Sequence, residues 1–421
     1  MNKLKKIFIY FLYFYVIALP LLPSKYKLKG IPINGDSILA FIIVLYFIKL
    51  IIDRESRNNF IRGFKELFKD YLNVFILLWI AMMYISIFYA KDRALAISET
   101  VRFTTYAVLY FIIRYDINDK KVLDNILKLY ISVSAVIGSI GIIQAIEGIG
   151  TASTGRLIDL TRVSSTIENA NNLGVFFILA VFPFLLLCIK EKNKYKKIMY
   201  SIFVLLALSN IILSGSRNAI LALIIGMVFL LIVYSLKAII FFIVGGGIAL
   251  IVPQSNNLIK ILGTKFQDPS RIKLWEIALY IIKDHPVLGV GNGNYRSYYS
   301  MYEKRVANID YTAHDNFHPH SIYLKAQCEL GIIGLISLAG ILISSVIRVL
   351  KFSFTVEDKF YKYFYKGFAA SIVAFMFMNA IDNFFSAPKV IAYFWIMLAI
   401  AECYKYNIKK TNAIIDKQFE N

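Results

Sequence analysis

Long apolar segments recur along the whole chain, and short polar loops separate them. Because a helix needs about 20 mostly apolar residues to cross the hydrocarbon core of a bilayer, we expect 12 membrane-spanning helices, near residues 7–23, 38–52, 72–90, 95–113, 124–146, 171–189, 198–213, 218–236, 238–253, 322–347, 364–383 and 389–404. The segment at 95–113 is the weakest, since it carries Glu99 and Arg102. The pattern predicts an all-α polytopic integral membrane protein, with residues 1–421 as a single membrane domain.

Composition agrees with this reading, because 58% of the residues are hydrophobic and only 18% are charged. A water-soluble fold of this length cannot bury so much apolar surface, which excludes an ordinary soluble enzyme. The formal net charge of +20 would suggest a nucleic-acid partner in a soluble protein. Here the basic residues lie in short loops between apolar segments, as they do in cytoplasmic loops of membrane proteins, so we predict no nucleic-acid partner.

The distribution of basic residues also predicts the orientation. With an even number of spans both termini lie on one side, and the tails and short loops of that side hold about three times as many Lys and Arg as those of the other side. The positive-inside rule therefore puts both termini in the cytoplasm. Residues 254–321, the one long loop, would then face outward between the ninth and tenth spans.

This long loop contains all four histidines of the chain, at positions 285, 314, 318 and 320, and we therefore predict that it carries the chemistry. Its segment 272–283 has apolar residues at helical spacing, namely Ile272, Trp275, Ala278, Leu279 and Ile282. This spacing predicts an amphipathic helix, which either lies on the outer membrane surface or only packs against the protein. After Pro286, the glycine-rich run 289–294 predicts a tight, flexible turn.

Arg217 stands between two apolar segments, at the predicted outer boundary of the membrane. A charged side chain in a bilayer is costly and usually has a function or a partner. Arg217 either extends to the interface or holds phosphate oxygens with its planar guanidinium group.

His318 and His320 lie where the long loop enters the tenth span. Histidine titrates near neutral pH, so His320 is a candidate general base. Two alternatives are a zinc site formed by His318 and His320 with His314 or Asp315, and histidines that are merely exposed. Asp382, late in the eleventh span, either lines a cavity or serves helix packing.

Four short motifs in this order resemble the O-antigen ligase and O-antigen polymerase superfamily of bacterial membrane glycosyltransferases. The ligase signature is matched by His320 and Ser321, nine further residues, Gly331, two residues and Gly334. The other three are the Ser214–Ala219 segment around Arg217, Arg271 with the helix and turn that follow it to Gly289, and Thr166–Asn172, in which Glu168 is atypical. The resemblance is strong over roughly residues 155–345.

The resemblance implies a GT-C-like helical fold in the bacterial inner (cytoplasmic) membrane, with its active site on the outer face. It implies a polyprenyl-diphosphate-linked glycan as donor and a glycan or lipid-glycan as acceptor, with membrane lipids around the protein. On this basis His320 is the general base, Arg217 and Arg271 bind the donor diphosphate, and His318, Arg162 and Asn171 are accessory residues. We expect no cofactor and no metal, and a single displacement that inverts the anomeric carbon.

Two other functions compete with an O-antigen-ligase-like transferase. A polysaccharide polymerase of the same superfamily would share most of the motifs. A flippase or transporter of lipid-linked glycans would also need many spans, but the sequence shows neither the repeat symmetry nor the paired interrupted helices of many transporters.

Overall fold

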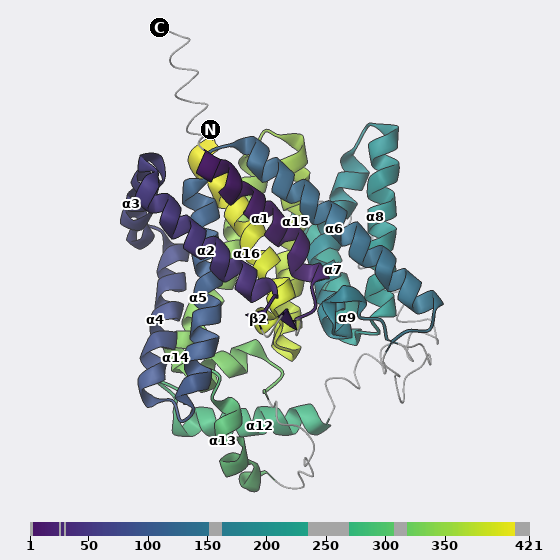
Figure 1. Ribbon diagram of the computed structural model, residues 1–421. Helices are drawn as coiled ribbons and strands as arrows, with labels where there is room; N and C mark the ends of the chain where they lie inside the picture. Colours follow the sequence, from purple (N-terminus) through teal and green to yellow (C-terminus); the bar gives the residue numbers. More distant parts are fainter. Residues whose placement is uncertain are drawn as a thin grey trace, which may run out of the picture.

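The computed structural model describes residues 3–24, 27–28, 31–150, 162–234, 269–306 and 318–408, which form a bundle of long helices (Figure 1). The long helices are α1 (Lys3–Leu21), α2 (Gly35–Ile52), α4 (Tyr71–Tyr89), α5 (Arg93–Asp116), α6 (Lys120–Ile146), α7 (Ala170–Lys190), α8 (Lys194–Leu213), α9 (Arg217–Tyr234), α14 (Ile322–Thr355), α15 (Lys359–Ile381) and α16 (Pro388–Cys403). The shorter elements are β1 (Lys27–Leu28), β2 (Ile31–Pro32), α3 (Arg54–Glu66), α12 (Pro269–Asp284), α13 (Tyr295–Tyr302), η1 (Leu67–Lys69), η2 (Ser165–Ile167), η3 (Glu303–Arg305), η4 (Phe384–Ser386) and η5 (Tyr404–Ile408). The two strands pair antiparallel, with Leu28 opposite Ile31.

Nine helices of the described residues are long and apolar enough to cross a membrane, and each falls on a predicted span. Two further predicted spans are helical but do not meet the same criteria: α5 carries several charged side chains, and α16 has only 16 residues. The predicted span 238–253 lies outside the described residues. A polytopic helical membrane protein is therefore supported, while the number 12 stays a prediction.

Helices α7, α15 and α16 form the centre of the bundle. Helix α7 packs against α8 and α15, and α14 packs against α4 and α15. Every side chain of α16 from Lys389 to Cys403 is buried. Other helices therefore cover α16 on all sides, whereas α2 and α9, which are also apolar, are mostly exposed at the surface of the bundle.

Several helix ends meet at one end of the bundle, together with α12 and α13. Figure 1 shows α12 and α13 at the end opposite the start of α1. One cavity at that end is lined by residues from the starts of α5, α7, α14 and α16 and from the end of α15. The antiparallel packing of successive helices therefore brings motifs that are far apart in the sequence to a common place.

A buried ionic cluster ties four helices together in another part of the bundle. Arg114 Nη2 of α5 lies 2.6 Å from Asp70 Oδ2 at the start of α4. Arg348 of α14 binds Asp70 Oδ1 at 2.9 Å and both carboxylate oxygens of Glu402 of α16. Charges in the interior of a membrane protein need such partners. The cluster explains charged positions to which the sequence alone assigned no role.

Helix α12 lies where the sequence predicts an amphipathic helix, but its buried face differs in part from the predicted one. The buried side chains include Leu274, Ile277 and Ile281, and the helix packs against α13 and α14. The predicted face contained Ile272 and Leu279, which are 38% and 55% exposed. The helix has apolar residues on two sides, and the position of α14 decides which side is covered.

Candidate functional site

The glycine-rich turn after α12 completes a break in α14. Gly331 has φ 66° and ψ −167°, which interrupts the helix. Across the break, Ile332 N donates to Pro286 O at 3.1 Å, and Val290 N donates to Cys328 O at 2.9 Å. Backbone groups that the break removes from the helix therefore find partners in the turn.

The other side of the same turn is held by α4 and α5. Asn294 Oδ1 accepts from Asp92 N at 2.7 Å, and its Nδ2 donates to Asp92 O at 3.1 Å. Asn292 N donates to Ser86 Oγ, and Asn292 Nδ2 donates to Thr100 Oγ1. The turn is tight, as predicted, but it is anchored on both sides, which is not the arrangement expected of a flexible turn.

His320 and Asp382 form the central pair of the candidate site. His320 Nδ1 lies 3.1 Å from Asp382 Oδ1, and the side chains are 34% and 12% exposed. Asp382 also holds the start of α14, because its carbonyl accepts from Ile322 N at 3.2 Å. His320 has φ 43°, an uncommon conformation for a residue with a side chain. With Nδ1 engaged by the carboxylate, Nε2 is the ring nitrogen left to exchange a proton with a substrate.

The surroundings of this pair control its charge. Burial alone would raise the pKa of Asp382, but the hydrogen bond and charge of His320 and the charge of Arg271 lower it below its ordinary value. His318 Nδ1 accepts from His320 N at 3.2 Å. Burial, followed by the charge of His320, lowers the pKa of His318 to about 4. Asp382 is therefore ionised and His318 neutral at physiological pH.

The two predicted diphosphate ligands lie at this end of the bundle, in different positions relative to the pair. Arg271 Nη1 donates to Ile381 O at 2.5 Å, directly before Asp382. Arg217 is the first residue of α9, and the next residue, Asn218, donates to Met378 O at 3.0 Å. Arg217 is thus beside the last turn of α15, and neither Arg217 nor Arg271 is among the described residues that line the cavity.

The accessory pair Arg162 and Asn171 connects two of the motifs. Arg162 Nη2 donates to Asn171 Oδ1 at 2.6 Å, and its Nε donates to Ser214 O at 2.9 Å. Asn171 lines the cavity. The atypical Glu168, at φ 66°, accepts hydrogen bonds from Ser24 and lies 3.4 Å from Lys389 Nζ. Glu168 therefore fixes the turn before α7 to neighbouring segments.

A polar cavity of about 450 Å³ opens between these elements. The predicted residues His318, His320 and Asn171 line it, together with Asp382. Its wall also holds charged side chains that the sequence analysis did not assign to the site: Glu99, Arg102, Arg296, Lys325 and Glu329. Four of these five residues are charged positions inside the predicted spans 95–113 and 322–347, and this unusual location was a signal in the sequence that could have identified them.

Three of the cavity residues have the composition of a metal site. The ligand atoms of His318, His320 and Asp382 all lie within 4.8 Å of one another, and His314 and Asp315 are outside the described residues. Two imidazoles and a carboxylate are a common zinc set. A metal bound through His320 Nδ1 would replace the hydrogen bond to Asp382, whereas a metal bound through Nε2 would leave that hydrogen bond in place.

The fold and the cavity define a helical membrane protein with a polar site at one end of the bundle. Residues 202–339 match the model of a family described as O-antigen ligase. The match confirms the resemblance to the O-antigen ligase and polymerase superfamily, and it covers Arg217, Arg271 and His320. It supports a membrane enzyme of the ligase or polymerase type. No curated protein matches the chain.

Proposed function

We propose that the protein is an O-antigen-ligase-like glycosyltransferase of the bacterial cytoplasmic membrane. It moves a glycan from a polyprenyl-diphosphate carrier to a hydroxyl of an acceptor outside the membrane. The observation that carries the proposal is the His320–Asp382 pair at the wall of a polar cavity, in a chain whose segment 202–339 matches the O-antigen ligase family. The loop 254–321 contributes Arg271 and His320 to this site.

In the proposed reaction, His320 Nε2 removes the proton from the acceptor hydroxyl while this oxygen attacks the anomeric carbon. The bond between the anomeric carbon and the diphosphate oxygen breaks, and the diphosphate leaves with the bonding electrons. A single displacement inverts the configuration at that carbon. Asp382 is a positioning residue, since its ionised carboxylate orients the imidazole and stabilises the imidazolium that forms.

The leaving diphosphate needs positive charge that is already in position. Arg271 is the better supported ligand, because it contacts the backbone beside Asp382. Arg217 lies at the same end of the bundle and would act on the part of the carrier nearer the membrane. For Arg217→Lys we expect a large loss of transfer, because Lys keeps the charge but cannot form a bidentate contact. Equal transfer by the two proteins would rule out bidentate binding.

The proposed reaction is metal-independent, and chelation tests this directly. We expect full transfer activity in membranes treated with excess EDTA. A loss of activity that returns on addition of Zn²⁺ would instead assign His318, His320 and Asp382 to a metal site.

The products that accumulate in a deletion strain separate a ligase from a polymerase. A ligase leaves full-length lipid-linked polymer, and a polymerase leaves a single lipid-linked repeat unit. We expect full-length lipid-linked polymer to accumulate in the deletion strain. Returning the wild-type gene should abolish this accumulation, whereas returning the His320→Ala gene should not. Absence of any lipid-linked glycan would contradict the proposed function. We infer an outward-facing site from the positive-inside pattern of the loops.

A further inference from the structure

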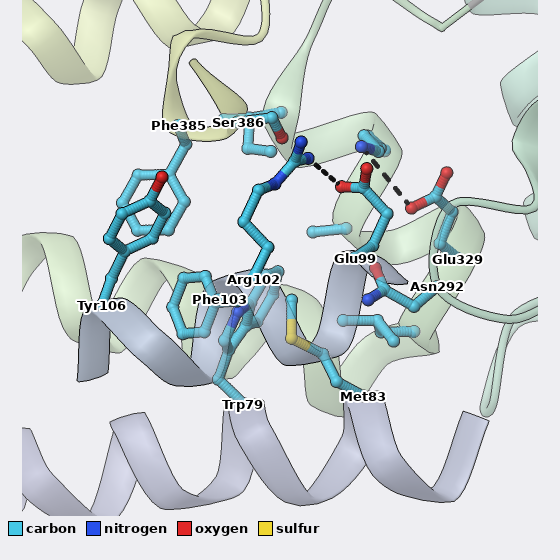
Figure 2. A pocket seen from close by; sticks show the side chains of 14 residues that line it. Trp79, Met83, Glu99, Arg102, Phe103, Tyr106, Asn292, Glu329, Phe385 and Ser386 are labelled. Atoms are coloured by element: carbon cyan, nitrogen blue, oxygen red, sulfur yellow. Dashed lines mark hydrogen bonds and ion pairs between the residues drawn. The ribbon is translucent and has the colours of Figure 1, made fainter. Parts of the chain in front are cut away.

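A second polar group lies in the cavity wall, contributed by α5 and α14. Arg102 Nη2 lies 2.5 Å from Glu99 Oε2, one turn apart on α5. Lys325 Nζ lies 3.9 Å from Glu329 Oε2, one turn apart on α14. All four residues line the cavity that contains His320. Figure 2 shows the Arg102 and Glu99 side chains directed toward each other, with Glu329 beyond Glu99.

The Arg102–Glu99 pair differs in exposure from the buried ionic cluster of Asp70, Arg114, Arg348 and Glu402. In that cluster the side chains are 4–13% exposed and each arginine lies near two carboxylates. The side chains of Arg102 and Glu99 are 30% and 21% exposed. Lys325 and Glu329 are only 13% and 3% exposed, but they lie too far apart for a hydrogen bond. Arg102 and Glu99 are therefore the members of the group that a ligand reaches most easily.

The position of Glu329 is fixed independently of Lys325. Its Oε2 accepts from Gly293 N at 2.8 Å, and its Oε1 accepts from Tyr295 N at 3.3 Å. Both donors belong to the anchored segment that follows α12. A rigid carboxylate in a cavity wall is suited to the recognition of a specific hydroxyl group.

The balance of charge argues against an anion in this part of the cavity. The four side chains of this group are two basic ones, Arg102 and Lys325, and two carboxylates, Glu99 and Glu329, so the group has no excess of positive charge. A diphosphate would be repelled by the carboxylates, whereas a hydroxyl group both donates and accepts hydrogen bonds.

Aromatic side chains stand next to the charged pairs. Trp79, Phe103, Tyr106 and Phe385 line the adjoining pocket with Glu99 and Arg102, and Figure 2 shows Tyr106 and Phe385 on the side of Arg102 away from Glu99. This pocket has a volume of only about 30 Å³ and these aromatic side chains are 2–7% exposed, so they support the Arg102 and Glu99 side chains from behind. A sugar ring would lie in the larger cavity of about 450 Å³, against the polar ends of the pairs.

We propose that Glu99, Arg102, Lys325 and Glu329 form a subsite that binds an uncharged sugar ring of the glycan substrate through its hydroxyl groups. This inference rests on the proposed glycosyl transfer, and it separates a sugar subsite from the diphosphate ligand Arg271. The ring belongs either to the donor glycan or to the acceptor, since both reach His320 during the reaction.

The test compares two lipids on the purified full-length protein in detergent. One is undecaprenyl diphosphate, which has no sugar, and the other is the lipid-linked glycan extracted from the deletion strain. For Arg102→Gln we expect a 10- to 100-fold loss of transfer, because charged hydrogen bonds to hydroxyl groups are lost. Its affinity for undecaprenyl diphosphate should stay within twofold of wild type, whereas Arg271→Gln should weaken that affinity.

The binding results identify the source of the sugar. Weaker binding of the lipid-linked glycan alone assigns the subsite to the donor, and unchanged binding of both lipids with reduced transfer assigns it to the acceptor. The proposed subsite is contradicted if Arg102→Gln weakens the binding of undecaprenyl diphosphate as much as Arg271→Gln does. It is also contradicted if Arg102→Gln leaves transfer unchanged. If wild type binds neither lipid, it is the proposed function that fails.

A swap of the pair distinguishes ligand binding from a structural role. The double variant Glu99→Arg, Arg102→Glu keeps an ion pair on α5 but exchanges the donor and the acceptor. A purely structural pair would be rescued by the swap, so restored transfer would overturn the proposal, and we expect transfer to remain low. Lys120→Gln, which breaks the pair with Asp124 on α6 and a second pair with Asp358, both outside this cavity, is the control for which we expect normal transfer.

Discussion

Replacement of Gly331 by Ala should disrupt the site more than the small size of the added methyl group suggests. A Cβ atom at this position would lie 1.9 Å from Val287 O, a backbone atom that cannot turn away. The combination of φ 66° and ψ −167° is almost confined to glycine and costs a residue with a side chain about 1–3 kcal/mol. The turn would have to move, and three hydrogen bonds between the turn and α14 would weaken, at about 1 kcal/mol each. We expect a total destabilisation of about 4–6 kcal/mol, the sum of these two contributions.

Gly148→Ala is the matched control for this prediction. Gly148 has φ 68°, but no atom of the described residues would lie within 4 Å of a Cβ atom there. Its substitution should therefore cost only the conformational part, about 1–2 kcal/mol. Thermal unfolding in detergent should show a clearly lower midpoint for Gly331→Ala than for Gly148→Ala, and transfer should be lost only in the former. Equal midpoints would show that the contact between the turn and α14 does not hold the site together.

Three further predictions follow from the ion pairs and the histidines. Asp382→Asn should lower transfer at least 100-fold with normal protein levels, because His320 loses its orienting charge; unchanged transfer would remove Asp382 from the mechanism. Arg348→Met should leave Glu402 without its main partner and lower the stability by about 3–5 kcal/mol, visible as a lower unfolding midpoint; an unchanged midpoint would contradict this. The lowered pKa of His318 means that only the unfolded chain gains its proton between pH 6.5 and about 4, so stability is complete above pH 6.5 and falls below it. At roughly 1.4 kcal/mol for each pH unit, the free energy of unfolding falls by about 3 kcal/mol between pH 6.5 and pH 4. The His318→Gln variant should lose less stability over the same pH range.

The sequence predicted the helices well because a membrane span needs a long apolar run and little else. It also identified motifs that meet in space, since each stands at the end of a span and the spans alternate in direction. Arg162, before α7, and Ser214, after α8, for example, are 52 residues apart and contact each other.

The sequence could not predict contacts that depend on how the helices pack. Asp382 was one polar residue late in a span, and only the packing of α14 against α15 places it beside His320. Glu99 and Arg102 weakened the prediction of a span, whereas the structure places them in the cavity wall. The buried face of α12 was partly wrong for the same reason, because a helix with two apolar sides does not specify which side a neighbour covers.

The most direct test of the account measures transfer by purified His320→Ala. Release of undecaprenyl diphosphate from the lipid-linked glycan is followed in the presence of the acceptor, and binding of undecaprenyl diphosphate is measured on the same preparation. The account predicts that binding stays within twofold of wild type while release falls at least 100-fold, as expected when a general base is lost. Release at the wild-type rate would contradict it, because the proton of the acceptor hydroxyl would then have to go to another group.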